Sequence, residues 1–158
     1  MHGKRHVAYG LALAVPAALL GGALVAEHAF GLPPCEMCWW QRYAHVAAVI
    51  LAATAYAAGR DALVRLAALA IVVSGLIGGF HAGVEYGWWE GLTRCAGGGL
   101  GDDPLASIMS APLVRCDVAP WSLFGISLAG LNFAISLAAG LTVLRLLGRA
   151  PARRAVTA

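Results

Sequence analysis

The sequence predicts an all-α fold, a four-helix transmembrane bundle with both termini in the cytoplasm and a long second loop on the outer side. The chain has 158 residues, of which 60% are hydrophobic and only 12% are charged, whereas soluble domains carry about 25% charged residues. Four stretches reach the length of about 20 apolar residues that a helix needs to cross a bilayer. Basic and acidic residues also segregate to opposite ends of these stretches, as in membrane proteins.

The four expected spans cover residues 7–26, 39–58, 66–83 and 121–144, within a single membrane domain over residues 1–158. The first span follows Lys4 and Arg5, so a cleaved signal peptide is an alternative, with Leu24-Val25-Ala26 as its cleavage site. Its apolar run is longer than the core of about 7 to 15 residues typical of signal peptides. We therefore interpret it as a span.

The distribution of charge predicts the orientation. Eight of the eleven basic residues flank one side, together with a single acid, Asp61. Basic residues near span ends stay in the cytoplasm, so both termini and the turn at 59–65 are expected there, and the loops 27–38 and 84–120 outside. Topology explains the net charge of +3 better than nucleic-acid binding does. The eight residues are Lys4, Arg5, Arg60, Arg65, Arg145, Arg149, Arg153 and Arg154.

All four cysteines lie in the two outer loops. Cys35 and Cys38 form a Cys-x-x-Cys pair at the start of the second span, directly after two prolines. Proline prevents the helix from extending further back, so both sulfurs are expected near a helix N-terminus. There the helix dipole favours the thiolate, the form that attacks disulfides.

A Cys-x-x-Cys pair alone also occurs in haem-attachment and zinc sites. Haem attachment requires a histidine directly after the second cysteine, where this chain has Trp39. A zinc site requires two more ligands at close spacing, and Cys95 and Cys116 lie 21 positions apart in a glycine-rich loop; we predict no metal. By itself the loop pair is equally typical of a static disulfide. Two pairs on the outer side together favour a relay of electrons between them.

Residues 34–42, Pro-Cys-Glu-Met-Cys-Trp-Trp-Gln-Arg, open a span after a short first loop and resemble the signature of the DsbB family of bacterial disulfide-forming membrane proteins. The loop cysteines and Trp121 before the last span follow the order of that family, and the resemblance covers residues 8–146. The vitamin K epoxide reductase family has a similar architecture. It places its Cys-x-x-Cys near a later span, after the loop pair, so the order here favours DsbB.

The resemblance implies a multi-pass oxidoreductase of the bacterial inner membrane with its active site facing the periplasm. It would reoxidise a periplasmic, thioredoxin-like DsbA-type protein and pass the electrons to ubiquinone or menaquinone. Cys95 and Cys116 would oxidise the partner, and Cys35 and Cys38 would reoxidise the loop pair. The resemblance further implies that Cys95 accepts the mixed disulfide and exchanges with Cys35, while Cys38 faces the quinone.

Three further residues are candidates for the quinone site. Arg42 lies one helical turn after Cys38, where it could hold the thiolate and polarise a quinone carbonyl, or extend to lipid headgroups. Trp39 could flank the quinone ring or belong to an interfacial aromatic belt. His81, with Glu85 one turn further, is a candidate hydrogen-bond donor or proton source to the quinone, or half of a structural pair.

Other patterns indicate packing or weaker candidates. Gly75 and Gly79 have the spacing that lets membrane helices approach closely, and residues 102–111 have the features of a short helix on the membrane surface. His45, one turn beyond Gln41, is a weaker functional candidate. The main alternative to an enzyme is a membrane scaffold whose two disulfides only stabilise the outer loops. A channel or transporter would require a relay of charged residues inside the spans, and the spans lack one.

Overall fold

The computed structural model describes residues 2–93 and 114–148. In this part of the chain there are four helices, which confirms the all-α prediction; they are α1 (His2–His28), α2 (Glu36–Ala58), α3 (Asp61–Glu85) and α5 (Leu128–Leu147). Three of them, α1, α3 and α5, are long and apolar enough to cross a membrane. The second helix has the length but a lower hydropathy, because its first half carries Gln41, Arg42 and His45.

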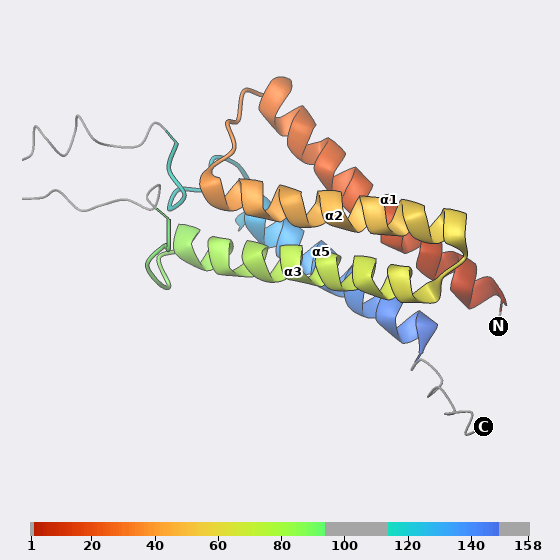
Figure 1. Cartoon of the computed structure of the whole chain (residues 1–158). Coiled ribbons are helices and arrows are strands. Elements are labelled where there is room, and N and C mark those ends of the chain that lie inside the picture. Colours follow the sequence, from red (N-terminus) through yellow and green to blue (C-terminus); the bar gives the residue numbers. More distant parts are fainter. Residues whose placement is uncertain (1, 94–113, 149–158) are drawn as a thin grey trace, which may run out of the picture.

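The helices form a bundle with two distinct ends. Figure 1 shows the N-terminus, the α2–α3 turn and the end of α5 at one end, and the α1–α2 connection, the end of α3 and the start of α5 at the other. We call the first the basic end and the second the cysteine end. The described parts of the two predicted cysteine-bearing loops thus share one end of the bundle. Cys95, the helix expected at 102–111 and the basic residues after position 148 lie outside the described residues.

The basic residues of the first end bind backbone and side-chain partners. Arg5 Nε lies 2.7 Å from Asp61 Oδ1, and Arg5 Nη2 donates to Gly59 O at 2.7 Å. Gly59 ends α2 with a φ of 62°, a conformation that glycine adopts at little cost. Arg65 Nη1 donates to Gly148 O at 2.6 Å just beyond α5. The charges that predict the orientation therefore also hold the helix ends together.

Small residues bring α3 and α5 together, as the sequence predicted. A Cβ atom at Gly78 would lie 2.9 Å from Ala129 O, and one at Gly75 would lie 3.1 Å from Ser136 Cβ. Both distances are tighter than ordinary packing allows, so larger residues would push the helices apart. Close approach of this kind stabilises helix pairs in membranes, where apolar surface alone gives no drive to associate.

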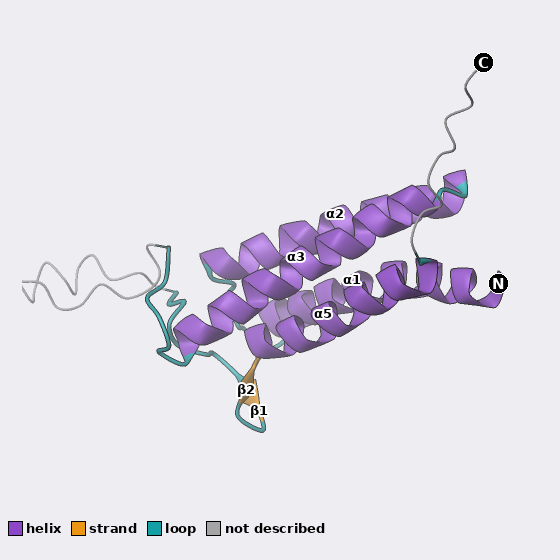
Figure 2. Cartoon of the chain, turned by 90° about the horizontal axis from the view of Figure 1, so that it is seen from below, coloured by secondary structure: helices purple, strands orange, loops and turns teal. Residues whose placement is uncertain are grey.

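The last helix begins at Leu128, later than the expected 121, because a hairpin precedes it. Strands β1 (Ser122–Leu123) and β2 (Ile126–Ser127) pair antiparallel around Phe124 and Gly125, whose φ values are 50° and 80°. Ser127 then caps the helix, since its Oγ accepts a hydrogen bond from Gly130 N at 3.1 Å. Figure 2 shows the hairpin at the start of α5.

Candidate active site: a dithiol beside a mainly apolar cavity

The Cys35–Cys38 pair lies at the start of α2, as the sequence predicted. Cys35 is the N-cap residue, and its Sγ accepts a hydrogen bond from Cys38 N at 3.3 Å. The two sulfurs are thiols 2.9 Å apart, whereas a disulfide is about 2.05 Å long. Two-electron oxidation with loss of two protons, together with a small closing movement, would therefore join them. The hydrogen bond with Cys38, followed by burial, raises the pKa of the Cys35 thiol above its usual range.

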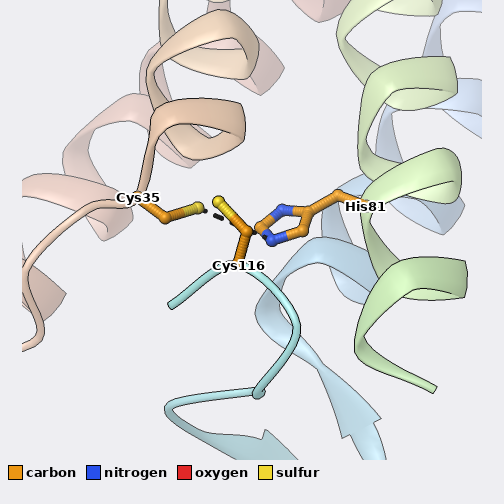
Figure 3. Close-up of side chains that lie close together, drawn as sticks. All are labelled: Cys35, His81 and Cys116. Carbon is orange, nitrogen blue, oxygen red and sulfur yellow. Dashed lines mark hydrogen bonds between the residues drawn. The ribbon is translucent and has the colours of Figure 1, made fainter. Parts of the chain in front are cut away.

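Cys116 lies beside this pair. It is fully buried and disulfide-bonded, and Thr93 Oγ1 lies 3.5 Å from its sulfur. The sulfurs of Cys35 and Cys116 and a ring nitrogen of His81 all lie within 4.8 Å of one another, in the arrangement shown in Figure 3. The structure thus brings a loop cysteine into contact range of the Cys-x-x-Cys pair.

The segment around Cys116 is held by an ion pair between its two neighbours in sequence. Arg115 donates from Nε and Nη2 to the two carboxylate oxygens of Asp117, at 2.9 and 2.6 Å. Such two-pronged pairs have a defined geometry. The pair spans Cys116, whose sulfur faces the buried side.

His81 connects the cysteines to the interior of the bundle. Its Nε2 lies 3.6 Å from Cys35 Sγ and 3.7 Å from Glu85 Oε1, and its Nδ1 lies 3.1 Å from Gln41 Nε2. The side chains of His81 and Glu85 are 3% and 2% exposed. This position agrees with the prediction that the two residues share a face. Cys35, His81 and Cys116 have the donor types of a metal site, but a disulfide sulfur is not the thiolate that binds metal.

Arg42 is buried between α1 and α2 and does not extend toward headgroups. Its Nη1 donates to Glu27 Oε2 at 2.5 Å and its Nη2 donates to Ala23 O at 3.1 Å. The sequence pattern did not predict this partnership with Glu27. The guanidinium carbon also lies 5.0 Å from the centre of the Trp39 ring. Trp39 itself is 42% exposed, and its ring centre lies 5.8 Å from that of Tyr43.

A network of buried polar side chains continues inward from His81. Asn132 of α5 is its centre and bonds Gln41 Oε1 at 2.8 Å and Ser74 Oγ at 3.2 Å. Ser136 Oγ donates to Asn132 Oδ1 at 2.8 Å, and His45 Nε2 lies 2.9 Å from the same oxygen. This hydrogen-bond network was not predicted from the sequence. An asparagine inside an apolar span is the signal that could have indicated it.

A cavity of about 300 Å³ opens beside the network and the cysteines. Its walls are mostly apolar residues of α1 and α5 with Pro33 and Pro34. In the described part of the chain, two buried polar atoms without a hydrogen-bond partner, His45 Nδ1 and Glu85 Oε2, belong to residues that line it. The polar lining residues are Cys38, Gln41, Arg42, His45, His81, Glu85 and Asn132.

The dithiol can exchange disulfides with Cys116. The adjacent cavity can hold a ring with polar substituents, because its apolar walls carry a few polar side chains. The cavity combines an apolar lining with a few converging polar groups, which is typical of small-molecule sites. Cys38 belongs to both the dithiol and the cavity wall, whereas Trp39 is not part of that wall. Of the predicted quinone-site residues, the structure therefore brings together Cys38, Arg42 and His81.

Comparisons with known proteins point to one family. The family model described as Disulfide bond formation protein DsbB matches residues 4–146. The chain is similar to Disulfide bond formation protein B of Polaromonas sp. (strain JS666 / ATCC BAA-500), with 32% identity over 87% of each chain. It is 33% identical to the protein of that name from Verminephrobacter eiseniae (strain EF01-2), over 84% of this chain and 80% of the relative. No solved structure matches the chain.

Proposed function

The chain belongs to the DsbB family, a family of disulfide-forming membrane proteins, and we propose that it reoxidises a DsbA-type thiol oxidase with a membrane quinone as electron acceptor. The family and the apolar helices make it a multi-pass protein of the inner membrane. The proposed partner is a soluble, thioredoxin-like protein of the periplasm. The proposed acceptor is ubiquinone or menaquinone.

The approach of Cys116 to Cys35 is the observation that carries the proposal. Thiol–disulfide exchange requires a thiolate to reach a disulfide sulfur directly, and these two sulfurs lie within 4.8 Å of each other. A Cys116 thiolate can attack Cys35 of an oxidised Cys35–Cys38 pair. The Cys35–Cys116 bond then forms, the Cys35–Cys38 bond breaks, and Cys38 leaves as the thiolate.

The resemblance to the family assigns this exchange with Cys35 to Cys95, which lies outside the described residues, so that assignment stays a prediction. The geometry supports Cys116 for this step. Cys95 remains the proposed site at which the partner's thiolate attacks, forming the mixed disulfide. That attack would release Cys116 beside Cys35. The partner's second cysteine would displace Cys95, and the Cys95 thiolate would then attack Cys116, restoring the loop disulfide and freeing Cys35.

The cavity supports a quinone as the acceptor. Its apolar walls suit a ring with an isoprenoid chain, and Cys38 and Arg42 line it together. A bound quinone would accept the two electrons that Cys35 and Cys38 release when their own disulfide re-forms, and with two protons it would become the quinol. Arg42 can orient the ring through its fixed charge, and Glu27 holds that guanidinium in place. Trp39 stacks against Arg42 and so would act on the ring indirectly.

The proposal also includes the orientation of the protein in the membrane: the cysteine end faces the periplasm and the basic end faces the cytoplasm. The basic end carries the residues that are retained in the cytoplasm. We expect a membrane-impermeant thiol reagent to label the reduced protein in intact spheroplasts. Labelling that requires lysis would refute this orientation.

The function is tested by anaerobic mixing of the purified, oxidised protein with a reduced thioredoxin-like partner and quinone. We expect catalytic oxidation of the partner with one quinol formed for each disulfide made. Partner oxidation without quinol formation would exclude the quinone as acceptor. Absence of any partner oxidation would favour the rival interpretation, a scaffold with static disulfides.

A further inference from the structure

Two backbone carbonyls set the direction of the hydrogen bonds in the polar network. A carbonyl oxygen only accepts, so the atom of Asn132 that lies 3.1 Å from Ser74 O is its amide nitrogen. The same reasoning assigns the amide nitrogen of Gln41, which lies 3.1 Å from Met37 O. Asn132 Nδ2 then donates to Gln41 Oε1 at 2.8 Å. The remaining oxygen, Asn132 Oδ1, can only accept.

This direction fixes the tautomer of His45. Its Nε2 lies 2.9 Å from Asn132 Oδ1, so Nε2 carries the hydrogen and donates it. In a neutral imidazole the other nitrogen then holds a lone pair. A second proton on Nδ1 would leave a buried charge and a buried N–H without a partner, which is costly in an apolar site. His45 Nδ1 is therefore a hydrogen-bond acceptor.

That acceptor is a buried atom without a partner in the described part of the chain, and it belongs to a residue of the cavity wall. His45 is 3% exposed, its Nδ1 has no hydrogen-bond partner among the described residues, and the residue lines the cavity. Arg42 lines the same cavity three positions earlier on α2, on the same helical face, and can only donate. The cavity thus offers a fixed donor and a fixed acceptor within one helical turn.

We propose that His45 accepts a hydrogen bond from a ring hydroxyl and so makes the cavity selective for the reduced, hydroquinone form of its ligand. A quinone has oxygens that only accept, so it can satisfy Arg42 but leaves His45 Nδ1 unpaired. A hydroquinone has hydroxyl groups that both donate and accept, so it can satisfy both. This inference rests on the proposed function and adds the ligand form that the site prefers.

Preference for the reduced ring would favour electron transfer away from the dithiol. A site that binds the product more tightly than the substrate shifts the equilibrium on the protein toward the product. For a two-electron couple each tenfold preference corresponds to about 30 mV. The product would then have to leave for the next turnover, so a strong preference would slow release.

The test measures binding of two ligands to the full-length, fully reduced protein in detergent under anaerobic conditions. One is a short-chain alkyl hydroquinone and the other is its di-O-methyl ether, which keeps the ring but has no hydroxyl donor. Neither can oxidise the reduced cysteines. We expect His45→Leu to weaken hydroquinone binding about fivefold to tenfold, the usual contribution of one hydrogen bond. Binding of the ether should stay unchanged.

Two further variants separate this role from a structural one. His45→Gln keeps a donor for Asn132 and an acceptor for the ligand, so it should restore much of the hydroquinone affinity. Ser136→Ala removes the other donor to Asn132 Oδ1 at a residue outside the cavity lining, and both affinities should stay near wild type. The ¹⁵N NMR signal of His45 Nδ1 should be that of an unprotonated nitrogen and shift on hydroquinone binding.

Equal weakening of both ligands in His45→Leu would overturn the inference, and so would an Nδ1 signal from a protonated nitrogen. Failure of both ligands to bind the wild-type protein would also overturn it. The proposed function is judged separately by quinol formation in the anaerobic assay with the reduced partner. If quinol still forms while any of these three negative results is obtained, the quinone-dependent function holds and only the proposed His45 contact is wrong.

Discussion

The two halves of the bundle are built from different side chains. Toward the basic end, the buried cluster consists mainly of alanine and valine with Tyr9, packed between α1, α2, α3 and α5. Toward the cysteine end, the buried residues include His81, Gln41 and Asn132, and the cavity lies among them. The buried residues of the first cluster are Ala8, Tyr9, Ala12, Ala52, Ala55, Val64, Ala67, Ala68 and Val143.

The basic half of the bundle holds the helices together, whereas the cysteine half carries the reactive groups. Small apolar residues let helices pack closely in a membrane, and their side chains have no groups that exchange protons or electrons. Buried polar side chains are costly in apolar surroundings unless they are hydrogen-bonded. The cysteine half offsets this cost through the Asn132 network, and within residues 2–93 and 114–148 only His45 Nδ1 and Glu85 Oε2 are buried polar side-chain atoms without a hydrogen-bond partner. We therefore expect mutations in the two halves to affect different measurements.

The largest expected effect is on catalysis and comes from Cys35→Ser in the cysteine half. The hydroxyl cannot form the disulfide or accept attack from Cys116, so turnover of the reduced partner should fall to the uncatalysed rate. The thermal unfolding midpoint should change little, because the substitution is nearly isosteric. The measurement is steady-state partner oxidation beside a thermal unfolding scan. Wild-type turnover in this variant would contradict the relay.

The opposite pattern is expected for Gly140→Ala in the basic half. A Cβ atom there would lie 2.6 Å from Val72 Cγ2 and 3.0 Å from Ala68 O, so α3 and α5 must separate. We expect a loss of about 1 to 3 kcal/mol in unfolding free energy, as for other overpacked sites. Turnover per folded molecule should be unchanged.

Gly21→Ala is the matched control for that helix–helix contact. A Cβ atom at Gly21 has no neighbour within 4 Å, so this variant should be at least as stable as wild type. Equal destabilisation by both substitutions would show that the close approach of α3 and α5 is not the cause. Lost turnover per folded molecule in Gly140→Ala would show that the two halves are coupled.

An intermediate effect is expected for Arg42→Met, within the cysteine half. It removes the fixed charge from the cavity wall, and charged hydrogen bonds contribute about 1.5 to 3 kcal/mol. The KM for quinone should therefore rise tenfold or more. Arg42→Lys should have a smaller effect, since it keeps the charge but loses the planar fork. The rate of thiol–disulfide exchange between the partner and the loop cysteines should not change. Single-turnover mixing without quinone measures this rate.

The smallest effect is expected for Trp39→Ala. The ring lies 5.0 Å from the Arg42 guanidinium carbon and is 42% exposed, and cation–π contacts at exposed sites contribute about 0.5 to 1 kcal/mol. The KM for quinone should rise about twofold to fivefold. A larger increase than that of Arg42→Met would mean that Trp39 contacts the ring directly, as one interpretation of the sequence holds.

Several features of the site could be predicted because they depend on neighbours along the chain. Two prolines followed by an apolar helix place Cys35 at the N-cap, whatever the rest of the protein does. The four-residue spacing from His81 to Glu85 puts both on one face of α3. The apolar stretches predict the helices, although the hairpin before Leu128 shows that an apolar run can begin outside a helix.

The sequence by itself determined the class of the protein, because apolar helices and the Cys-x-x-Cys motif are set by local composition and short spacings. Tertiary structure alone decided which distant groups meet. The contact range of Cys116 and Cys35, the pair of Arg42 with Glu27 and the bond from Asn132 to Gln41 each join separate segments. No spacing encodes these contacts, since they depend on how far the helices approach and rotate. That approach is set by the small residues of α3 and α5.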